Sequence, residues 1–147
     1  MRATRHRLDP LLRPRSIALV GVSRDSGRRQ TIGGNTILQA LIDFGYDGRI
    51  DLVHPSGEPV AGRPSSRSIG ELPATPDALI LTLPAAAVPA AVAEAGSRGV
   101  AAAVVLAAGF SELADAEGIR LGQELADAAA ATDLQVCGPN GLGYLNV

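Results

Sequence analysis

The chain has 147 residues, of which 46% are hydrophobic and 19% charged, as is typical of one globular domain. This composition excludes disordered and collagen-like proteins. The formal net charge is −2, so the chain lacks the overall positive charge that favours nucleic-acid binding, and no nucleic-acid partner is expected. Because Phe and Tyr contribute two residues each and Trp none, the core has to be built from aliphatic side chains.

The charge is unevenly distributed along the chain. Residues 1–29 contain eight of the thirteen Arg and only two acids, and the chain contains no Lys. We expect residues 1–15 to form a basic N-terminal arm and residues 16–147 to form a single folded domain. The excess of Arg predicts either an anionic ligand near the N-terminal third or a solvated basic segment.

The number of cysteines and the length of the hydrophobic segments indicate in which cellular compartment the protein is expected. Cys137 is the single Cys, which excludes an internal disulfide and fits a reducing cytoplasm. We expect it to be an inert residue in a buried strand, with no metal site because Cys and His are not clustered. The apolar runs are too short for a membrane span, and the N-terminus is too charged for a secretory signal. A cytoplasmic protein without membrane contact is therefore expected.

The first half of the chain contains three predicted strands and one helix. Residues 16–22 are a continuous apolar run that ends in Gly and Ser, which predicts a buried parallel strand and a loop. A helical stripe follows within residues 33–45, with Gly45 as its stop. Strands are predicted at residues 49–53 and 77–83, and residues 57–76 look like a surface crossover with one helical turn at 68–72.

The second half repeats the alternation of helix and strand. A helix is predicted from Val88 to Ala95, with Gly96 as its stop. A strand at residues 101–107, a helix at 113–132 and a strand at 134–137 follow. Five strands alternating with helices predict an α/β fold, a doubly wound, Rossmann-like parallel sheet of about five strands in three layers. Its ligand is expected beyond the carboxyl ends of the strands, whose five turns should line one rim.

The turn after the first strand is the main candidate for ligand binding. Residues 21–27 (GVSRDSG) lie between a strand and a helix that starts with two Gly residues, where free N–H groups and the helix dipole favour phosphate. Arg24, Arg28 and Arg29 are candidates for further phosphate contacts. The turn lacks a strict G-x-G-x-x-G pattern, so a plain connector is the alternative.

The ends of the other strands argue against ordinary NAD or ATP chemistry. The second strand ends at Val53-His54-Pro55, where an NAD site usually has an acid for the ribose hydroxyl. A chain without Lys also lacks the ammonium group of an NTPase P-loop. The residues therefore indicate a phosphate-bearing ligand of another kind.

Five segments in the same order resemble the CoA-binding domain of the NDP-forming (ADP-forming) acyl-CoA synthetases, a family related to the succinyl-CoA ligase alpha subunit. They are residues 11–23 (LLRPRSIALVGVS), 48–55 (GRIDLVHP), 81–84 (LTLP), 104–110 (VVLAAGF) and 138–143 (GPNGLG). The resemblance covers nearly the whole chain, and it implies a Rossmann-like CoA-binding domain that is part of a larger protein.

The resemblance implies that coenzyme A lies across the strand ends. Its phosphates would lie near Gly21, Ser23, Arg24, Ser26 and Gly27. Its adenosine end would approach Val53, Pro55 and Ser56, and the next turn would pack against it through Thr82, Leu83, Pro84 and Val88. The pantetheine and thiol end would face Ala107, Ala108, Gly109, Asn140 and Gly141.

In the family, acid, CoA and ATP are converted to acyl-CoA, ADP and phosphate through a phosphohistidine. The resemblance therefore implies ATP-grasp and phosphohistidine domains as partners. This chain has only His6 and His54, so no catalytic residue is predicted, and His54 is expected to cap its turn. Two departures from the family are Ser56 in place of a Lys and Gly141 in place of a Cys.

Three functions remain open from the sequence. The leading one is a CoA-binding module of a synthetase, with Arg28 and Arg29 either replacing the missing Lys or forming a solvated loop. The second is a non-catalytic module that senses CoA or NAD(H), for example in a protein acyltransferase. The third is a small Rossmann oxidoreductase, against which the missing acid of the second strand counts.

Overall fold

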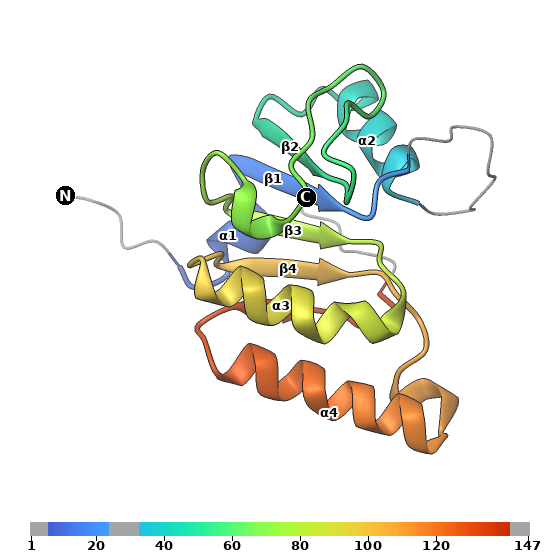
Figure 1. Cartoon of the computed structure of the whole chain (residues 1–147). Helices are drawn as coiled ribbons and strands as arrows, with labels where there is room; N and C mark the ends of the chain where they lie inside the picture. The colour runs from blue at the N-terminus through green and yellow to red at the C-terminus, as the bar shows by residue number, and fades with distance from the viewer. Residues whose placement is uncertain (1–5, 24–32, 142–147) are drawn as a thin grey trace.

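The computed structural model describes residues 6–23 and 33–141. Five parallel strands form one sheet in the order β2-β1-β3-β4-β5 (Figure 1). They are β1 (Ser16–Val20), β2 (Arg49–Val53), β3 (Ala78–Leu81), β4 (Ala102–Val105) and β5 (Gln135–Cys137). The predicted Rossmann-like α/β fold is thus confirmed. Within the two described segments, no helix is long and apolar enough to cross a membrane.

Helices cover both faces of the sheet. The α-helices are α1 (Asp9–Leu12), α2 (Gly34–Asp43), α3 (Val88–Ser97) and α4 (Ala116–Ala130), and the short 3-10 helices are η1 (Ile69–Glu71), η2 (Ala85–Ala87) and η3 (Ser111–Leu113). The helix α2 packs on one face, while α3 and α4 lie side by side on the other (Figure 1). The domain is therefore a three-layer structure, as the sequence predicts.

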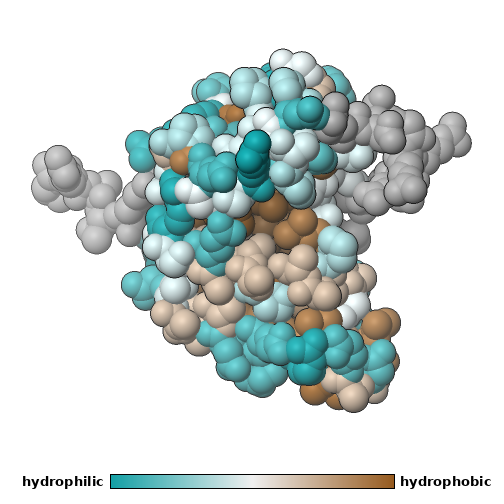
Figure 2. Space-filling view, in the orientation of Figure 1, coloured by the Kyte–Doolittle hydropathy of each residue, from teal (hydrophilic) through white to brown (hydrophobic). Residues whose placement is uncertain are grey.

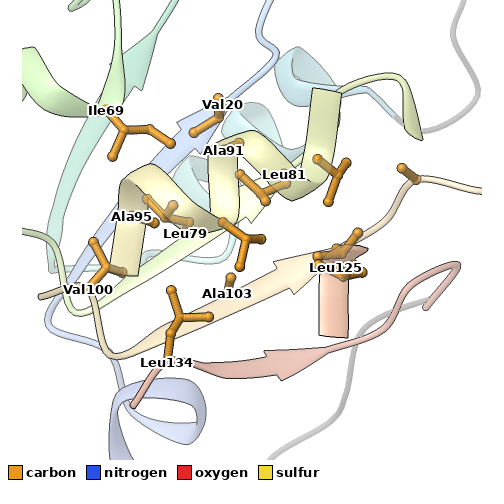
Figure 3. Packing of buried hydrophobic residues seen from close by; sticks show 14 of the residues in the cluster. Val20, Ile69, Leu79, Leu81, Ala91, Ala95, Val100, Ala103, Leu125 and Leu134 are labelled. Atoms are coloured by element: carbon orange, nitrogen blue, oxygen red, sulfur yellow. The ribbon is translucent and has the colours of Figure 1, made fainter. Parts of the chain in front are cut away.

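Alternation along the strands builds the two halves of the core. In β1, Ile17 and Leu19 belong to the cluster under α2, whereas Ala18 and Val20 belong to the cluster under α3 and α4. Successive side chains of a strand point to opposite faces of the sheet, so a sheet that is covered on both faces buries them alternately in two clusters. Leu79 and Ala103 lie in the second cluster beneath Ala91 and Ala95 of α3 (Figure 3). Small Ala side chains let this helix approach the sheet closely.

Two predicted helices have different bounds in the structure. The helix predicted at 113–132 is α4 (Ala116–Ala130), because Leu113 belongs to the separate helix η3. The end of the helix predicted at 88–95 also differs, and the reason is a packing contact. The sequence predicts that Gly96 ends the third helix, but α3 continues to Ser97. A β-carbon on Gly96 would lie 2.5 Å from the Thr132 hydroxyl. The absence of a side chain at Gly96 therefore allows Thr132, which follows α4, to pack against α3. The chain reverses instead at Gly99, whose φ is +74°, a left-handed value that favours glycine.

The described part of the N-terminal arm is packed against the domain. The helix α1, which was not predicted, contacts β4. The Tyr46 hydroxyl donates to the Pro14 carbonyl at 3.0 Å, and the Arg15 N–H donates to Asp77 Oδ2 at 2.8 Å. A second correction concerns Cys137, which is half-buried rather than buried because β5 is the edge strand of the sheet.

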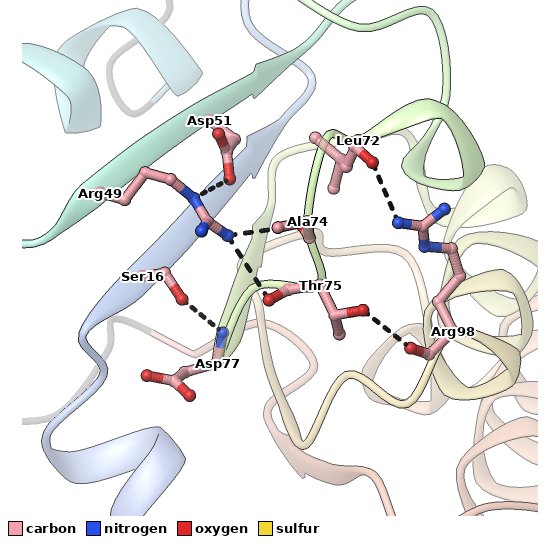
Figure 4. Close-up of polar contacts among 8 residues, drawn as sticks. All are labelled: Ser16, Arg49, Asp51, Leu72, Ala74, Thr75, Asp77 and Arg98. Atoms are coloured by element: carbon pink, nitrogen blue, oxygen red, sulfur yellow. Dashed lines mark hydrogen bonds and ion pairs between the residues drawn. The ribbon is translucent and has the colours of Figure 1, made fainter.

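Polar contacts at the amino ends of the strands hold the long connection between β2 and β3 (Figure 4). Arg49 Nη2 lies 3.4 Å from the carbonyl oxygens of Ala74 and Thr75. The Arg98 guanidinium donates to the Leu72 carbonyl at 3.0 Å and also to the Gly70 carbonyl. Arg98 therefore ties the connection to the end of α3.

Replacing Arg98 with Met is expected to lower the free energy of unfolding by about 1–3 kcal/mol, because two carbonyl groups lose a charged donor. Urea unfolding followed by circular dichroism measures this loss. Arg63→Met is the matched control, since the Arg63 side chain is exposed and makes no hydrogen bond within the described residues. Equal urea midpoints for the two variants would show that Arg98 does not hold the connection.

Candidate functional site

The strand order reverses between β1 and β3, and this point is where doubly wound sheets bind ligands. Gly21 follows β1 there with a φ of +101°. A β-carbon on Gly21 would lie 2.6 Å from Thr82 Oγ1 and 2.9 Å from the Thr82 carbonyl carbon. The Thr82 hydroxyl also lies 3.1 Å from the carbonyl oxygens of Val20 and Gly21. The ends of β1 and β3 are therefore tied together, and only glycine fits between them.

The chain beyond Gly21 is held against the first turn of α2. Asn35 Oδ1 accepts from the Ser23 N–H at 3.0 Å, and its Nδ2 donates to the Ser23 carbonyl at 2.7 Å. A β-carbon on Gly34 would lie 2.9 Å from Val22 Cα. The described start of the predicted phosphate turn, at Ser23, is thus hydrogen-bonded to the N-terminal turn of α2. Arg24, Ser26, Gly27, Arg28 and Arg29 lie outside the described residues.

A pocket of about 270 Å³ opens at this point of the sheet. It brings together four residues that the sequence predicts: Gly21, Val53, Pro55 and Leu83. The sequence analysis did not include its other lining residues: Val20, Arg67, Ser68, Ile69, Ala87, Ala90, Ala91 and Glu94. Figure 2 shows a hydrophobic hollow on this face, beside the Ala-rich surface of α3. A mainly apolar pocket with a few polar groups suits a heterocyclic base.

The connection between β2 and β3 supplies one wall of this pocket. Ser66 accepts from the His54 N–H and donates to the Leu52 carbonyl, each at 2.9 Å. This short pairing extends the sheet beside β2 and brings Arg67, Ser68 and Ile69 to the pocket. The segment that the sequence predicts as a surface crossover is thus part of the candidate site.

The turn after β2 is organised by His54. Its Nδ1 accepts from the Ser56 N–H at 3.2 Å and lies 2.8 Å from the Ser56 hydroxyl. The Ser56 Oγ in turn accepts from the Glu58 N–H at 3.2 Å. The predicted capping role of His54 is therefore confirmed. Ser56 is part of this cap and does not line the pocket.

The end of β4 forms the other half of the predicted rim. The Asn140 N–H donates to the Ala107 carbonyl at 2.9 Å, which brings the turn after β5 to the end of β4. Glu112 accepts from the N–H groups of Gly109 and Phe110 at 2.6 and 3.1 Å. The bond from Gly109 is the main cause that lowers the pKa of the Glu112 carboxyl. The Glu112 carboxylate thus fixes the backbone of the turn after β4 through two hydrogen bonds.

The remaining predicted residues differ in their exposure. Ala108 is exposed, and Gly141 is half-buried. Pro84 is exposed at the start of η2. Val88 is fully buried in the core under α3, so its side chain packs against the sheet and offers no surface to a ligand in this structure.

A second hollow of about 320 Å³ lies along the outer side of β2. Its lining residues are Ile50, Asp51, Leu52, Arg63, Pro64, Ser65, Ser66 and Pro73. Arg49 forms an ion pair with Asp51 at 2.9 Å, which leaves this carboxylate already neutralised. None of the residues predicted for ligand binding lines this hollow.

Comparisons with known proteins agree with the sequence resemblance. The family described as "CoA binding domain" matches residues 15–146. Acetate–CoA ligase [ADP-forming] I of Archaeoglobus fulgidus is 36% identical over 139 residues, which cover 95% of this chain and 19% of the relative. The alpha subunit of acetate–CoA ligase [ADP-forming] I of Pyrococcus furiosus is 32% identical, with 94% of this chain and 30% of the relative covered.

Solved structures show the same relationship. The apo form of a dinucleotide-forming acetyl-coenzyme A synthetase 1 from Ca. Korarchaeum cryptofilum is 30% identical with a TM-score of 0.82. The match covers 94% of this chain and 29% of that chain. The present chain thus spans between about a fifth and a third of these proteins. Since the family match extends over most of its length, the chain belongs to the CoA binding domain family.

Proposed function

We propose that this chain binds coenzyme A across the carboxyl ends of β1, β3 and β4 and is the CoA-binding module of an ADP-forming acyl-CoA synthetase. The observation that carries the proposal is the apolar pocket at the β1/β3 switch point, beside the turn that Gly21 begins. The family match and the ligases among the relatives support it.

The site has a separate environment for each part of the ligand. The adenine base occupies the pocket between Val53, Ile69 and Ala91. The pyrophosphate lies at Ser23, near the free N–H groups and the positive dipole end of α2. The pantetheine arm passes Leu83, and its thiol end reaches the turn where Asn140 bonds to Ala107. The predicted residues Ser56, Thr82, Pro84, Ala108, Gly109 and Gly141 lie in or beside these strand-end turns.

In this function the chain holds CoA as a substrate, and other domains supply the remaining chemistry. His54 is engaged in its own turn with Ser56, so we assign it no part in phosphoryl transfer. The proposed partners are an ATP-grasp domain and a domain that carries the phosphohistidine. Together they would convert an acid, CoA and ATP to acyl-CoA, ADP and phosphate in the cytoplasm.

Asn35→Ala is expected to weaken CoA binding about tenfold, a change of about 1.4 kcal/mol, because the turn at Ser23 loses its two hydrogen bonds to the Asn35 side chain. Isothermal titration calorimetry of the purified chain measures this change. Gln39→Ala is the control on the same helix, since the single hydrogen bond of the Gln39 amide among the described residues is to Asp43.

NAD is expected to bind more weakly than CoA to the unmodified chain, because β2 ends at Val53 without an acid for the ribose hydroxyl. Tighter binding of NAD than of CoA would refute the proposal. So would equal CoA affinities of the Asn35 and Gln39 variants, since the turn at Ser23 would then not be part of the site.

A further inference from the structure

The pocket contains one positively charged side chain that has no partner among the described residues. Arg67 and Glu94 are the charged residues that line it. Glu94 Oε1 already accepts from the Gly70 N–H at 2.6 Å. The Arg67 side chain is exposed, and within residues 6–23 and 33–141 no hydrogen bond or ion pair engages its guanidinium. Arg67 therefore places a guanidinium without a described partner at a mainly apolar pocket.

The backbone around Arg67 fixes the place of this cation. Ser66 is hydrogen-bonded on both sides to the end of β2. Gly57 has a φ of +67°, and a β-carbon on it would lie 2.7 Å from Arg67 Cγ and 3.1 Å from Nε. The stem of Arg67 thus lies on the turn formed by residues 54–57, which has a glycine where the stem crosses it. Arg67 and Pro55 both line the pocket, so the Arg67 side chain lies where the turn after β2 meets the pocket.

Arg67 belongs to a different segment of the chain from the described start of the phosphate turn, residues 21–23. The turn that begins at Gly21 follows β1, whereas Arg67 comes from the connection that pairs with the outer side of β2. A ligand with its base in the pocket and its pyrophosphate near Ser23 turns its ribose toward the strand ends. A phosphate on that ribose requires a cation of its own. The chain has no Lys, and of the described Arg residues, Arg67 alone lines this pocket.

We infer that Arg67 binds the 3′-phosphate of coenzyme A and makes the site selective for a 3′-phosphorylated nucleotide. The inference rests on the proposed function, because it assumes that CoA occupies the pocket. A phosphate monoester carries close to two negative charges at neutral pH. The planar guanidinium offers two parallel donors to such a group, which an unphosphorylated ribose cannot use.

The test compares CoA with dephospho-CoA on three forms of the protein by calorimetric titration. The unmodified chain is expected to bind CoA about tenfold more tightly than dephospho-CoA. Arg67→Ala is expected to weaken CoA binding about tenfold and to leave dephospho-CoA binding within about twofold, a difference of about 1.4 kcal/mol between the ligands. Arg67→Lys should retain part of the preference, because it keeps the charge without the bidentate geometry.

Arg63→Ala is the matched control, since Arg63 is exposed on the same connection but lines the other hollow. Because the Arg67 stem lies on the turn of residues 54–57, thermal unfolding of Arg67→Ala is measured as well, and an unchanged melting temperature shows that the fold is intact. Equal weakening of both ligands, no weakening of either, or the same loss in Arg63→Ala would overturn the inference and leave the proposed function standing. Failure of the unmodified chain to bind either ligand would overturn both.

Discussion

Gly21→Ala is expected to lower the free energy of unfolding by about 2–4 kcal/mol and to abolish measurable CoA binding. The new methyl group would meet Thr82 at 2.6 to 2.9 Å from three atoms, two of them in the backbone. Its φ of +101° is also unfavourable for alanine. The ends of β1 and β3 would have to separate, and the pocket and the phosphate turn both begin at this point.

Gly45→Ala separates the effect of the steric clash from the effect of the unfavourable φ. Gly45 has a φ of +72° but no atom within 4 Å of its would-be β-carbon, so alanine there brings backbone strain of about 1–2 kcal/mol without a clash. Chemical unfolding and CoA titration of both variants measure the difference. A Gly21→Ala protein as stable as Gly45→Ala, with unchanged affinity for CoA, would contradict the role given to the close approach of β1 and β3.

Phe110→Ala is expected to lower the free energy of unfolding by about 3–5 kcal/mol, the usual cost of truncating a buried aromatic residue. Phe110 is fully buried in the cluster under α3 and α4. Its carbonyl group lies against Gly118 at the start of α4, so the same residue positions the turn after β4 that would receive the thiol end.

Phe44→Ala is the control, because Phe44 is 91% exposed at the end of α2. A change within about 0.5 kcal/mol is expected for this surface position. Urea denaturation at equal protein concentration compares the two variants. Similar stabilities would mean that Phe110 does not contribute to the core as its burial implies.

The strands and the start of the site were predictable because their signals are local. The apolar run at residues 16–22 and the Gly residues after it specify a buried strand and a tight turn, and the structure has both at Ser16–Val20 and Gly21. The family resemblance assigned Val53, Pro55 and Leu83 to the CoA site. Val53 and Leu83 are the last residues of predicted strands, and Pro55 lies two residues after one of them. Parallel strands bring their carboxyl ends to one edge of the sheet whatever their order.

The rest of the pocket depends on contacts between distant segments. Arg67, Ser68 and Ile69 reach it because Ser66 pairs with the end of β2, and no local pattern in a Pro- and Gly-rich segment specifies that pairing. One signal was available, since Ile69 and Leu72 are the two apolar residues of the single predicted helical turn, and both are buried. Gly96 is a second example of a residue whose role depends on a distant segment. A glycine near the end of a helical pattern can be a helix stop or a site of close packing, and the sequence alone does not show that Gly96 packs against Thr132.

The most direct test of the central claim is to locate CoA by NMR. In a ¹⁵N-labelled sample titrated with CoA, we expect the largest amide shifts at Gly21, Val53, Ile69 and Leu83, which line the pocket at the switch point. Amides of Asp51 and Arg63 at the second hollow should hardly shift. Shifts concentrated at the second hollow, or no shifts at all at saturating CoA, would contradict the assignment of the crevice between β1 and β3 as the CoA site.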